Sequence, residues 1–175
     1  ADFNVRERGG DRSKAVLVPQ VLGPDRAPLP DVSVEAWPPT GNRDASAPVA
    51  TASTGPHFGP ARFTSLPAGN YLIRARKPGY RAAVVTVSDV DPEAREPRYV
   101  TIQLDKGATI DALVTDTKGV PQRGVGLEVT PNDPEGEDQD PAARLAAASG
   151  VISVPPSNHQ TGHIGVTGLA ARTYT

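Results

Sequence analysis

The sequence predicts an all-β protein that consists of two tandem β-sandwich domains. Glycine and proline number 17 and 19 of 175 residues, which is too many for a helical protein and fits short strands joined by turns. Many short stretches alternate apolar and polar residues, which is the period of a half-buried strand. The pattern of the first hundred residues also recurs further along the chain, as expected for repeated domains.

The first domain is predicted to span 15–104, after an extended arm or linker at 1–14 in which Phe3 and Val5 alternate with polar residues. Pro19 confines the first strand to an edge or to a bulge, because proline has no N–H to donate. Seven strands, at 15–22, 31–37, 49–52, 62–64, 71–76, 81–90 and 99–104, suit a sandwich.

The stretch 59–80 is the centre of this domain and reads as a strand, a tight turn and a second strand. The turn is Leu66-Pro67-Ala68-Gly69, which combines a fixed φ at proline with a free φ at glycine. Tyr71, Ile73 and Ala75 are expected on one face, and Leu72, Arg74 and Arg76 on the other. The predicted core residues are Phe63, Leu66, Tyr71 and Ile73.

Three motifs in this domain carry a resemblance to a known family. They are Pro28-Leu29-Pro30-Asp31-Val32-Ser33-Val34, the run from Arg62-Phe63 to Asn70-Tyr71, and Pro78-Gly79-Tyr80. In this order they resemble the carboxypeptidase regulatory-like domains, which are grouped with the transthyretin-like and collagen-adhesin B-type repeats. The resemblance covers most of 15–104 and implies an immunoglobulin/transthyretin-like sandwich. Gly59-Pro60-Ala61 departs from the family's usual Asp-Gly turn, and folds of this kind carry many functions.

A second domain is predicted at 105–175. Residues 120–129 align with 27–36 at an offset of 93, and residues 162–169 align with 59–66 at an offset of 103. Between them, Asp140-Pro141 and Gly150 bracket a predicted short helix near 141–148. The alignment leaves this domain about two strands short at Thr175, so we expect that it is truncated or is completed by another segment.

Composition and motifs exclude several classes of function. The formal net charge of −2 argues against nucleic-acid binding, and no apolar run is long enough for a membrane span. Cysteine is absent, which says little about the cellular compartment. The sequence has no nucleophile elbow, phosphate-binding glycine loop or Cys/His pair, so no enzyme activity, catalytic residue or cofactor is predicted.

Metal ligands are also too few for a predicted site. His159 and His163 are four residues apart but lie in a predicted loop, and His57 is distant in sequence, so surface histidines are the simpler interpretation. An acidic run is either a solvated loop or a calcium-binding loop, which the sequence leaves open. It consists of Asp133, Glu135, Glu137, Asp138 and Asp140.

The candidate partner-binding residues are Trp37, Arg62, Arg74 and Arg76. The arginines gather with Lys77 and Arg81 near the outward face of the predicted hairpin, where they form either a site for an acidic partner or an ordinary charged sheet face. Trp37 is out of phase with Val32, Val34 and Ala36. It either stacks on a sugar or a partner, or caps the end of the sandwich core.

These observations favour a non-catalytic structural or adhesive module of a bacterial surface protein, filament or particle. Its expected partners are other protein subunits, joined by strand pairing, and its expected location is extracellular or at the cell surface. The alternative is a ligand- or carbohydrate-binding accessory domain of a secreted hydrolase or peptidase. A carbohydrate binder would expose Trp37 with Tyr71, Tyr80 or Tyr99 as a stacking platform, whereas a structural module would bury these residues.

Overall fold

The computed structural model describes residues 16–40, 47–129, 142, 145, 152–154 and 162–169. The arm at 1–14, the acidic run at 133–140 and His159 lie outside this part of the chain. The described strands are β1 Leu17–Leu22, β2 Ser33–Trp37, β3 Ala50–Ser53, β4 Gly69–Arg76, β5 Ala83–Val90, β6 Arg98–Gln103, β7 Ala108–Leu113, β8 Leu127–Val129, β9 Ile152–Val154 and β10 His163–Leu169.

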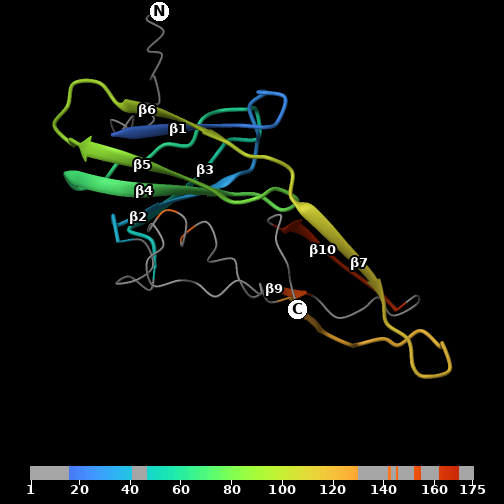
Figure 1. Cartoon of the computed structure of the whole chain (residues 1–175). Helices are drawn as coiled ribbons and strands as arrows, with labels where there is room; N and C mark the ends of the chain where they lie inside the picture. Colours follow the sequence, from blue (N-terminus) through green and yellow to red (C-terminus); the bar gives the residue numbers. More distant parts are fainter. Residues whose placement is uncertain are drawn as a thin grey trace, which may run out of the picture.

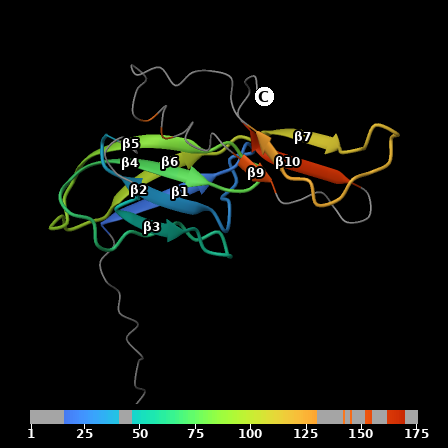
Figure 2. The same cartoon turned by 90° about the horizontal axis from the view of Figure 1, so that it is seen from below.

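The strands up to β6 form a two-layered sandwich, which we call the first unit (Figure 1). One layer is an antiparallel sheet of four strands in the order β3-β2-β4-β5, and the other pairs β1 with β6 in parallel. The remaining strands form a smaller second unit, and both views show β7 and β10 extending away from the sandwich (Figures 1 and 2). The all-β fold class is therefore confirmed.

The core between the two layers contains the four residues that the alternation predicted. Leu66 and Ile73 are 2% and 0% exposed, and Phe63 and Tyr71 are 3% and 6% exposed. They form one cluster with buried apolar residues of neighbouring strands, among them Leu17, Val34, Val87 and Ile102, and Ala50 and Ala52 of β3 pack against it. The side chains that face inward on β4 are thus the ones expected from a period of two.

The predicted hairpin around Leu66–Gly69 is wrong. Phe63 forms an isolated bridge with Leu17 of β1, whereas β4 pairs with β2 and β5 in the other sheet. The turn therefore carries the chain from one layer to the other, and the hydroxyl of Tyr71 braces it by donating a hydrogen bond to the Pro67 carbonyl (2.8 Å). Because only Phe63 of 62–64 forms a bridge and the segment is not a strand, the first unit has six described strands instead of seven.

Strand β1 accommodates Pro19 near an edge of its sheet, as predicted. One side of β1 pairs with β6 along its whole length. The other side carries no full strand among the described residues but short segments around Phe63 and Pro28, and the Pro19 carbonyl accepts a hydrogen bond from Ala61 N–H there (3.0 Å).

The internal repeat is visible as matching strand registers in the two units. Leu17 lies opposite Phe63 in the first unit, and Ile110 lies opposite Val166 in the second, both antiparallel. These pairs differ by 93 and 103 residues, the two offsets that the sequence alignment predicted. The second unit therefore repeats the backbone pairing of the first as well as its residue pattern.

The turn after the first strand is repeated too. The Leu22–Pro28 bridge recurs as Thr115–Pro121, again 93 residues later. Strands β8 and β9 pair antiparallel as β2 and β3 do, but the connection between β8 and β9 is ten residues longer. Of the short helix predicted there, only Ala142 and Leu145 are described, and both are helical. The domain limits 15–104 and 105–175 stay predictions.

Backbone-to-backbone packing joins the two units where β6 passes into β7. Gly107 N–H donates to the Gly79 carbonyl (3.0 Å), and a Cβ on Gly107 would lie 2.2 Å from the Cα of Gly168. Gly168 has a φ of 84° and lies against the Tyr80 carbonyl, so neither glycine has room for a side chain. Among the described residues, no helix is long and apolar enough to cross a membrane.

Candidate functional site

The candidate site lies on the outer face of the four-stranded sheet, on β2 and β4. The register places Glu35 opposite Arg74 and Trp37 opposite Leu72. With Val34 and Ala36 of β2 facing the core, the period of two turns Glu35 and Trp37 outward. An acid, an arginine and a tryptophan thus come together on a face that is usually solvated.

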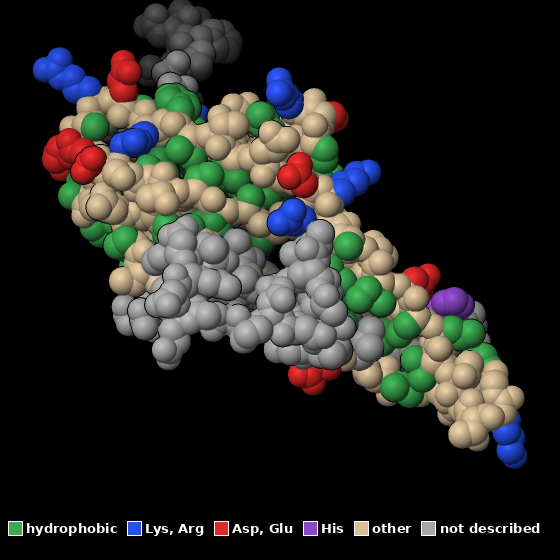
Figure 3. All heavy atoms as spheres, in the orientation of Figure 1, with side chains coloured by type: hydrophobic (Ala, Val, Ile, Leu, Met, Phe, Trp, Pro, Cys, Tyr) green, Lys and Arg blue, Asp and Glu red, His purple; other side chains and the backbone are tan. Residues whose placement is uncertain are grey.

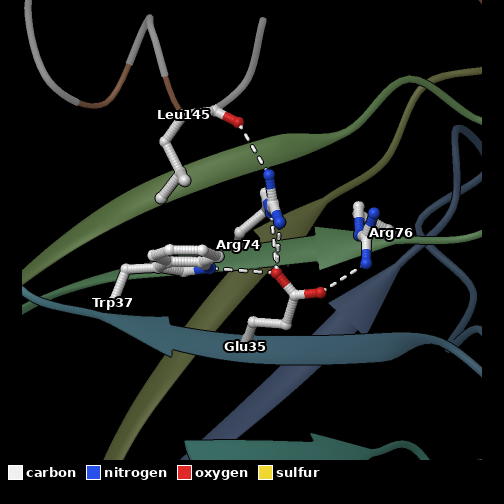
Figure 4. Close-up of polar contacts among 5 residues, drawn as sticks. All are labelled: Glu35, Trp37, Arg74, Arg76 and Leu145. Atoms are coloured by element: carbon white, nitrogen blue, oxygen red, sulfur yellow. Dashed lines mark hydrogen bonds and ion pairs between the residues drawn. The ribbon is translucent and has the colours of Figure 1, made fainter. Parts of the chain in front are cut away.

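Glu35 is the centre of this cluster (Figure 4). Its Oε2 accepts hydrogen bonds from Arg74 Nε (2.8 Å) and Trp37 Nε1 (2.9 Å), and Arg74 Nη2 lies 2.6 Å from the same oxygen. Its other oxygen, Oε1, is 2.5 Å from Arg76 Nη2. Both oxygens therefore have charged donors, and such bonds are stronger than neutral ones.

The exposure of the three charged groups differs. The side chains of Glu35 and Arg74 are 6% and 8% exposed, whereas that of Arg76 is 47% exposed. Burial alone raises the pKa of Glu35. Hydrogen bonds from Trp37 and Arg74 and the positive charges of Arg74 and Arg76 lower this pKa, and their combined effect is larger than that of burial. The net result is a pKa below the ordinary value. Glu35 is thus an ionised anchor for two arginines and has no spare proton for acid catalysis.

Trp37 occupies neither of the places that the sequence suggested. It is 5% exposed, so it offers no open surface for a sugar, and it packs in a cluster separate from the sandwich core, so it does not cap that core. Its ring lies 5.0 Å from the guanidinium carbon of Arg74, within the range of a cation–π contact. The capping prediction failed because β2 has both faces covered.

The cover over this outer face comes from the second unit. Leu145 is fully buried and forms one apolar cluster with Trp37 and Leu72, and Ala142 packs against this cluster. The Leu145 carbonyl accepts a hydrogen bond from Arg74 Nη1 (3.2 Å). Both residues belong to the long connection between β8 and β9, so Arg74 binds groups from both units at once (Figure 4).

The other basic residues predicted near this face lie elsewhere. Arg62 is exposed on the segment beside β1, in the opposite layer of the sandwich. Lys77 donates to the Pro30 carbonyl (2.8 Å), and Arg81 is exposed beyond the end of β4. Of the four predicted partner-binding residues, the structure thus brings together Trp37, Arg74 and Arg76.

Sequence reasoning missed Glu35 and Leu145. Glu35 alternates with Val34 and Ala36, and this pattern could have placed it on the outer face beside Trp37. Leu145 had no usable signal, because it is 71 residues from Arg74 and its partner depends on the arrangement of the two units.

The aromatic residues do not form a stacking platform. Trp37 and Tyr71 are buried on opposite faces of the same sheet, and Tyr80 is partly buried against the core. Tyr99 is 71% exposed, but it belongs to β6 in the other layer. The burial of Trp37 and Tyr71 is what a structural module predicts, whereas the exposure of Tyr99 is not.

The described residues contain no group of three or more His, Cys, Asp or Glu side chains that could hold a metal. His57 is exposed, and His163 lies on β10 with its Nδ1 3.6 Å from Asp111 Oδ1. Two histidines four residues apart lie on the same face of a helix, but His163 is on a strand.

No protein-family model and no curated protein matches the chain. Three similar solved structures are the Bacillus anthracis TIE protein (12% identity, TM-score 0.38), a streptococcal ancillary pilin (20%, 0.40) and a mutant of the shaft pilin spaA from Lactobacillus rhamnosus GG (19%, 0.38). The matches cover 86%, 90% and 90% of this chain. They span 25%, 51% and 83% of those proteins, so this chain corresponds to a quarter of the first and about half of the second. At these values the similarities carry no functional argument.

Proposed function

We propose that the chain is a non-catalytic structural or adhesive module of a bacterial surface protein, filament or particle, acting outside the cell through protein–protein contacts. The observation that carries this proposal is the clamp of Arg74, which binds Glu35 in the first unit and the Leu145 carbonyl of the second. The contacts of this cluster therefore join the two units of the same molecule.

A fixed arrangement of two units is what a spacer or filament segment requires. Tandem domains move relative to one another by default unless their interface is extensive and apolar. Here the contact has an apolar part at Trp37, Leu72 and Leu145, and a backbone part at Gly107 and Gly168. Each of these contacts joins residues of the first unit to residues of the second, so together they restrict the movement of one unit relative to the other.

The accessory carbohydrate-binding function has less support. Such a function needs exposed aromatic faces that share one surface, and Trp37 and Tyr71 are both buried. The cluster around Glu35 is covered by Leu145, and of its charged side chains only that of Arg76 is partly exposed to a ligand.

A distance measurement between spin labels in the two units tests this function. Because the chain has no cysteine, labels can be attached through Thr51→Cys on β3 and Thr109→Cys on β7, both exposed positions. We expect one narrow distance distribution, which broadens when Leu145→Asp places a charge in the apolar contact. Val120→Asp, at an exposed position of the second unit, is the matched control and should leave the distribution narrow.

A broad distribution in the labelled chain without further substitution would contradict a rigid spacer. An equal broadening in the Leu145→Asp and Val120→Asp chains would show that the clamp does not set the arrangement.

A further inference from the structure

A hollow with a volume of about 350 Å³, which we call the basic hollow, lies where the two units meet. The first unit contributes the end of β4 and the turn after it, and the second contributes β10, so both units form its walls. Ligand sites are common at such interfaces. The molecule narrows at this junction, and basic side chains lie on the visible surface beside it (Figure 3). The described lining residues with polar side chains are Ser33, Arg76, Lys77, Tyr80 and Thr167.

The basic hollow is lined by spare hydrogen-bond donors. Nη2 of Arg76 binds Glu35 (2.5 Å), and the Nε and Nη1 groups of Arg76 have no partner among the described residues. Nζ of Lys77 donates to the Pro30 carbonyl (2.8 Å), which leaves two of its three N–H groups. The lining hydroxyl groups likewise have no hydrogen-bond partner in the described part of the chain. The hollow is therefore suited to a ligand with several acceptor atoms.

The charge around the basic hollow is positive, although the whole chain has a formal net charge of −2. Within the described ranges, Glu35 is the one carboxylate that forms an ion pair with Arg74 or Arg76, and Lys77 forms none. Three cations thus share one carboxylate. Glu35 contacts Arg76 on the side away from Trp37 and so fixes the guanidinium in place (Figure 4). A second carboxylate, supplied by a ligand, would compensate the remaining positive charge.

A second hollow adjoins the first, and Tyr80 lines both of them. It has a volume of about 510 Å³ and is walled mainly by prolines, a leucine, an alanine and Phe58, whose side chain is 60% exposed. Its two charged residues, Asp25 and Lys106, have opposite signs, so it has no clear preference for one charge. We call it the apolar hollow, because its lining favours an apolar group.

We propose that the two hollows bind an acidic segment of a partner protein. A carboxylate of the segment is bound by Arg76 and Lys77, and an apolar side chain of the same segment packs against Phe58. Charged hydrogen bonds from arginine and lysine to a carboxylate are stronger than neutral ones. A phosphate ion or a sugar acid would occupy only the basic hollow, whereas a peptide reaches both. Because the segment belongs to a protein partner, this assignment rests on the proposed structural or adhesive function.

A nuclear magnetic resonance titration of the intact chain tests this site. The probe is the blocked peptide Leu-Gly-Asp-Glu-Asp-Gly-Leu, which reads the same in both directions. We expect saturable shifts of the backbone amides of Lys77, Tyr80 and Thr167. The uncharged counterpart Leu-Gly-Asn-Gln-Asn-Gly-Leu should bind at least about tenfold more weakly. Inorganic phosphate and glucuronate, each added alone, should also bind more weakly than the acidic peptide.

Two variants and a matched control locate the binding site. Lys77→Glu should weaken binding of the acidic peptide at least about tenfold, because it places a like charge beside the carboxylate. Arg62→Glu makes the same charge change at an exposed position in the opposite layer and should leave the affinity unchanged. Thr167→Trp keeps every charge but fills the basic hollow from the second unit, so it should also block the peptide.

No shift at these amides, equal affinity for the two peptides, or tighter binding of phosphate or glucuronate would overturn the proposal. So would an equal loss in the Lys77→Glu and Arg62→Glu chains, or unchanged binding to Thr167→Trp. Failure of this proposal is distinguishable from failure of the proposed function. A narrow spin-label distance distribution in a chain that does not bind the peptide would remove the site and leave the structural function in place.

Discussion

Arg74 and Glu35 lie directly opposite one another on β4 and β2, with Nη2 of the arginine 2.6 Å from Oε2 of the glutamate. Both side chains are more than nine-tenths buried. A buried pair of this kind adds little net stability compared with well-packed apolar residues, but removal of one partner leaves an uncompensated charge.

Arg74→Ala should destabilise the protein far more than Arg76→Ala. The first change leaves Glu35 buried without its main partner and also removes the bond to the Leu145 carbonyl, so we expect a loss of about 3–5 kcal/mol. The second removes a half-exposed ion pair, for which the expected loss is about 0–1 kcal/mol. Urea unfolding of the two variants checks this, and equal losses would mean that the buried pair is not the centre of the cluster.

Glu35→Gln should reduce the dependence of stability on acid pH. The pKa of Glu35 is lower in the folded protein than its ordinary value of 4.5. Its contribution is therefore complete above about pH 4.5 and is lost as the pH falls through the lower, folded pKa. As the pH is lowered through this range, the melting temperature of the unsubstituted chain should fall more steeply than that of the Glu35→Gln variant. Glu128→Gln, at the exposed equivalent position on β8, is the control and should keep the original slope.

Phe63→Ala should cost about 3–5 kcal/mol, because it empties a large buried site between the two layers. The neighbouring Arg62→Ala removes an exposed side chain and should change the free energy of unfolding by no more than about 0.5 kcal/mol. Denaturant titration of both variants gives the comparison. A loss under about 1 kcal/mol for Phe63→Ala would mean that this side chain is not a core residue.

Gly107→Ala should disturb the junction of the two units. The added Cβ would lie 2.2 Å from the Cα of Gly168, so one backbone must move. Gly59→Ala is the matched control, because a Cβ there meets nothing within 4 Å. We expect a lower melting temperature for the first variant only. Equal melting temperatures would show that the backbones at the junction are free to separate.

The sequence was sufficient for the features that local pattern determines. Alternation identified the inward residues Phe63, Tyr71 and Ile73, and the recurrence of the pattern predicted the offsets seen in the Ile110–Val166 pairing. It failed where the partner of a segment is decided by distant residues. The turn at Leu66–Gly69 has the composition of a hairpin, but Phe63 pairs with β1 because both arms of the turn must cover opposite sides of one core.

The candidate site was only half predictable for the same reason. The sequence predicts Trp37, Arg74 and Arg76 as candidate partner-binding residues, but it does not identify the groups that they contact. A carboxylate on the neighbouring strand and a leucine from the second unit decide that this face is closed rather than solvated. The alternation of apolar and polar residues along a strand predicts neither contact, because each depends on how separate elements pack.

The most direct test of the clamp is the fluorescence of Trp37, which is the only tryptophan in the chain. In the unsubstituted protein, Trp37 lies beneath Leu145, so its emission should be blue-shifted and weakly quenched by acrylamide. Leu145→Asp should shift the emission to the red and increase quenching, while circular dichroism still shows the strands of the first unit. Unchanged emission and quenching in the Leu145→Asp variant would contradict the account, because they would mean that the second unit does not cover this face.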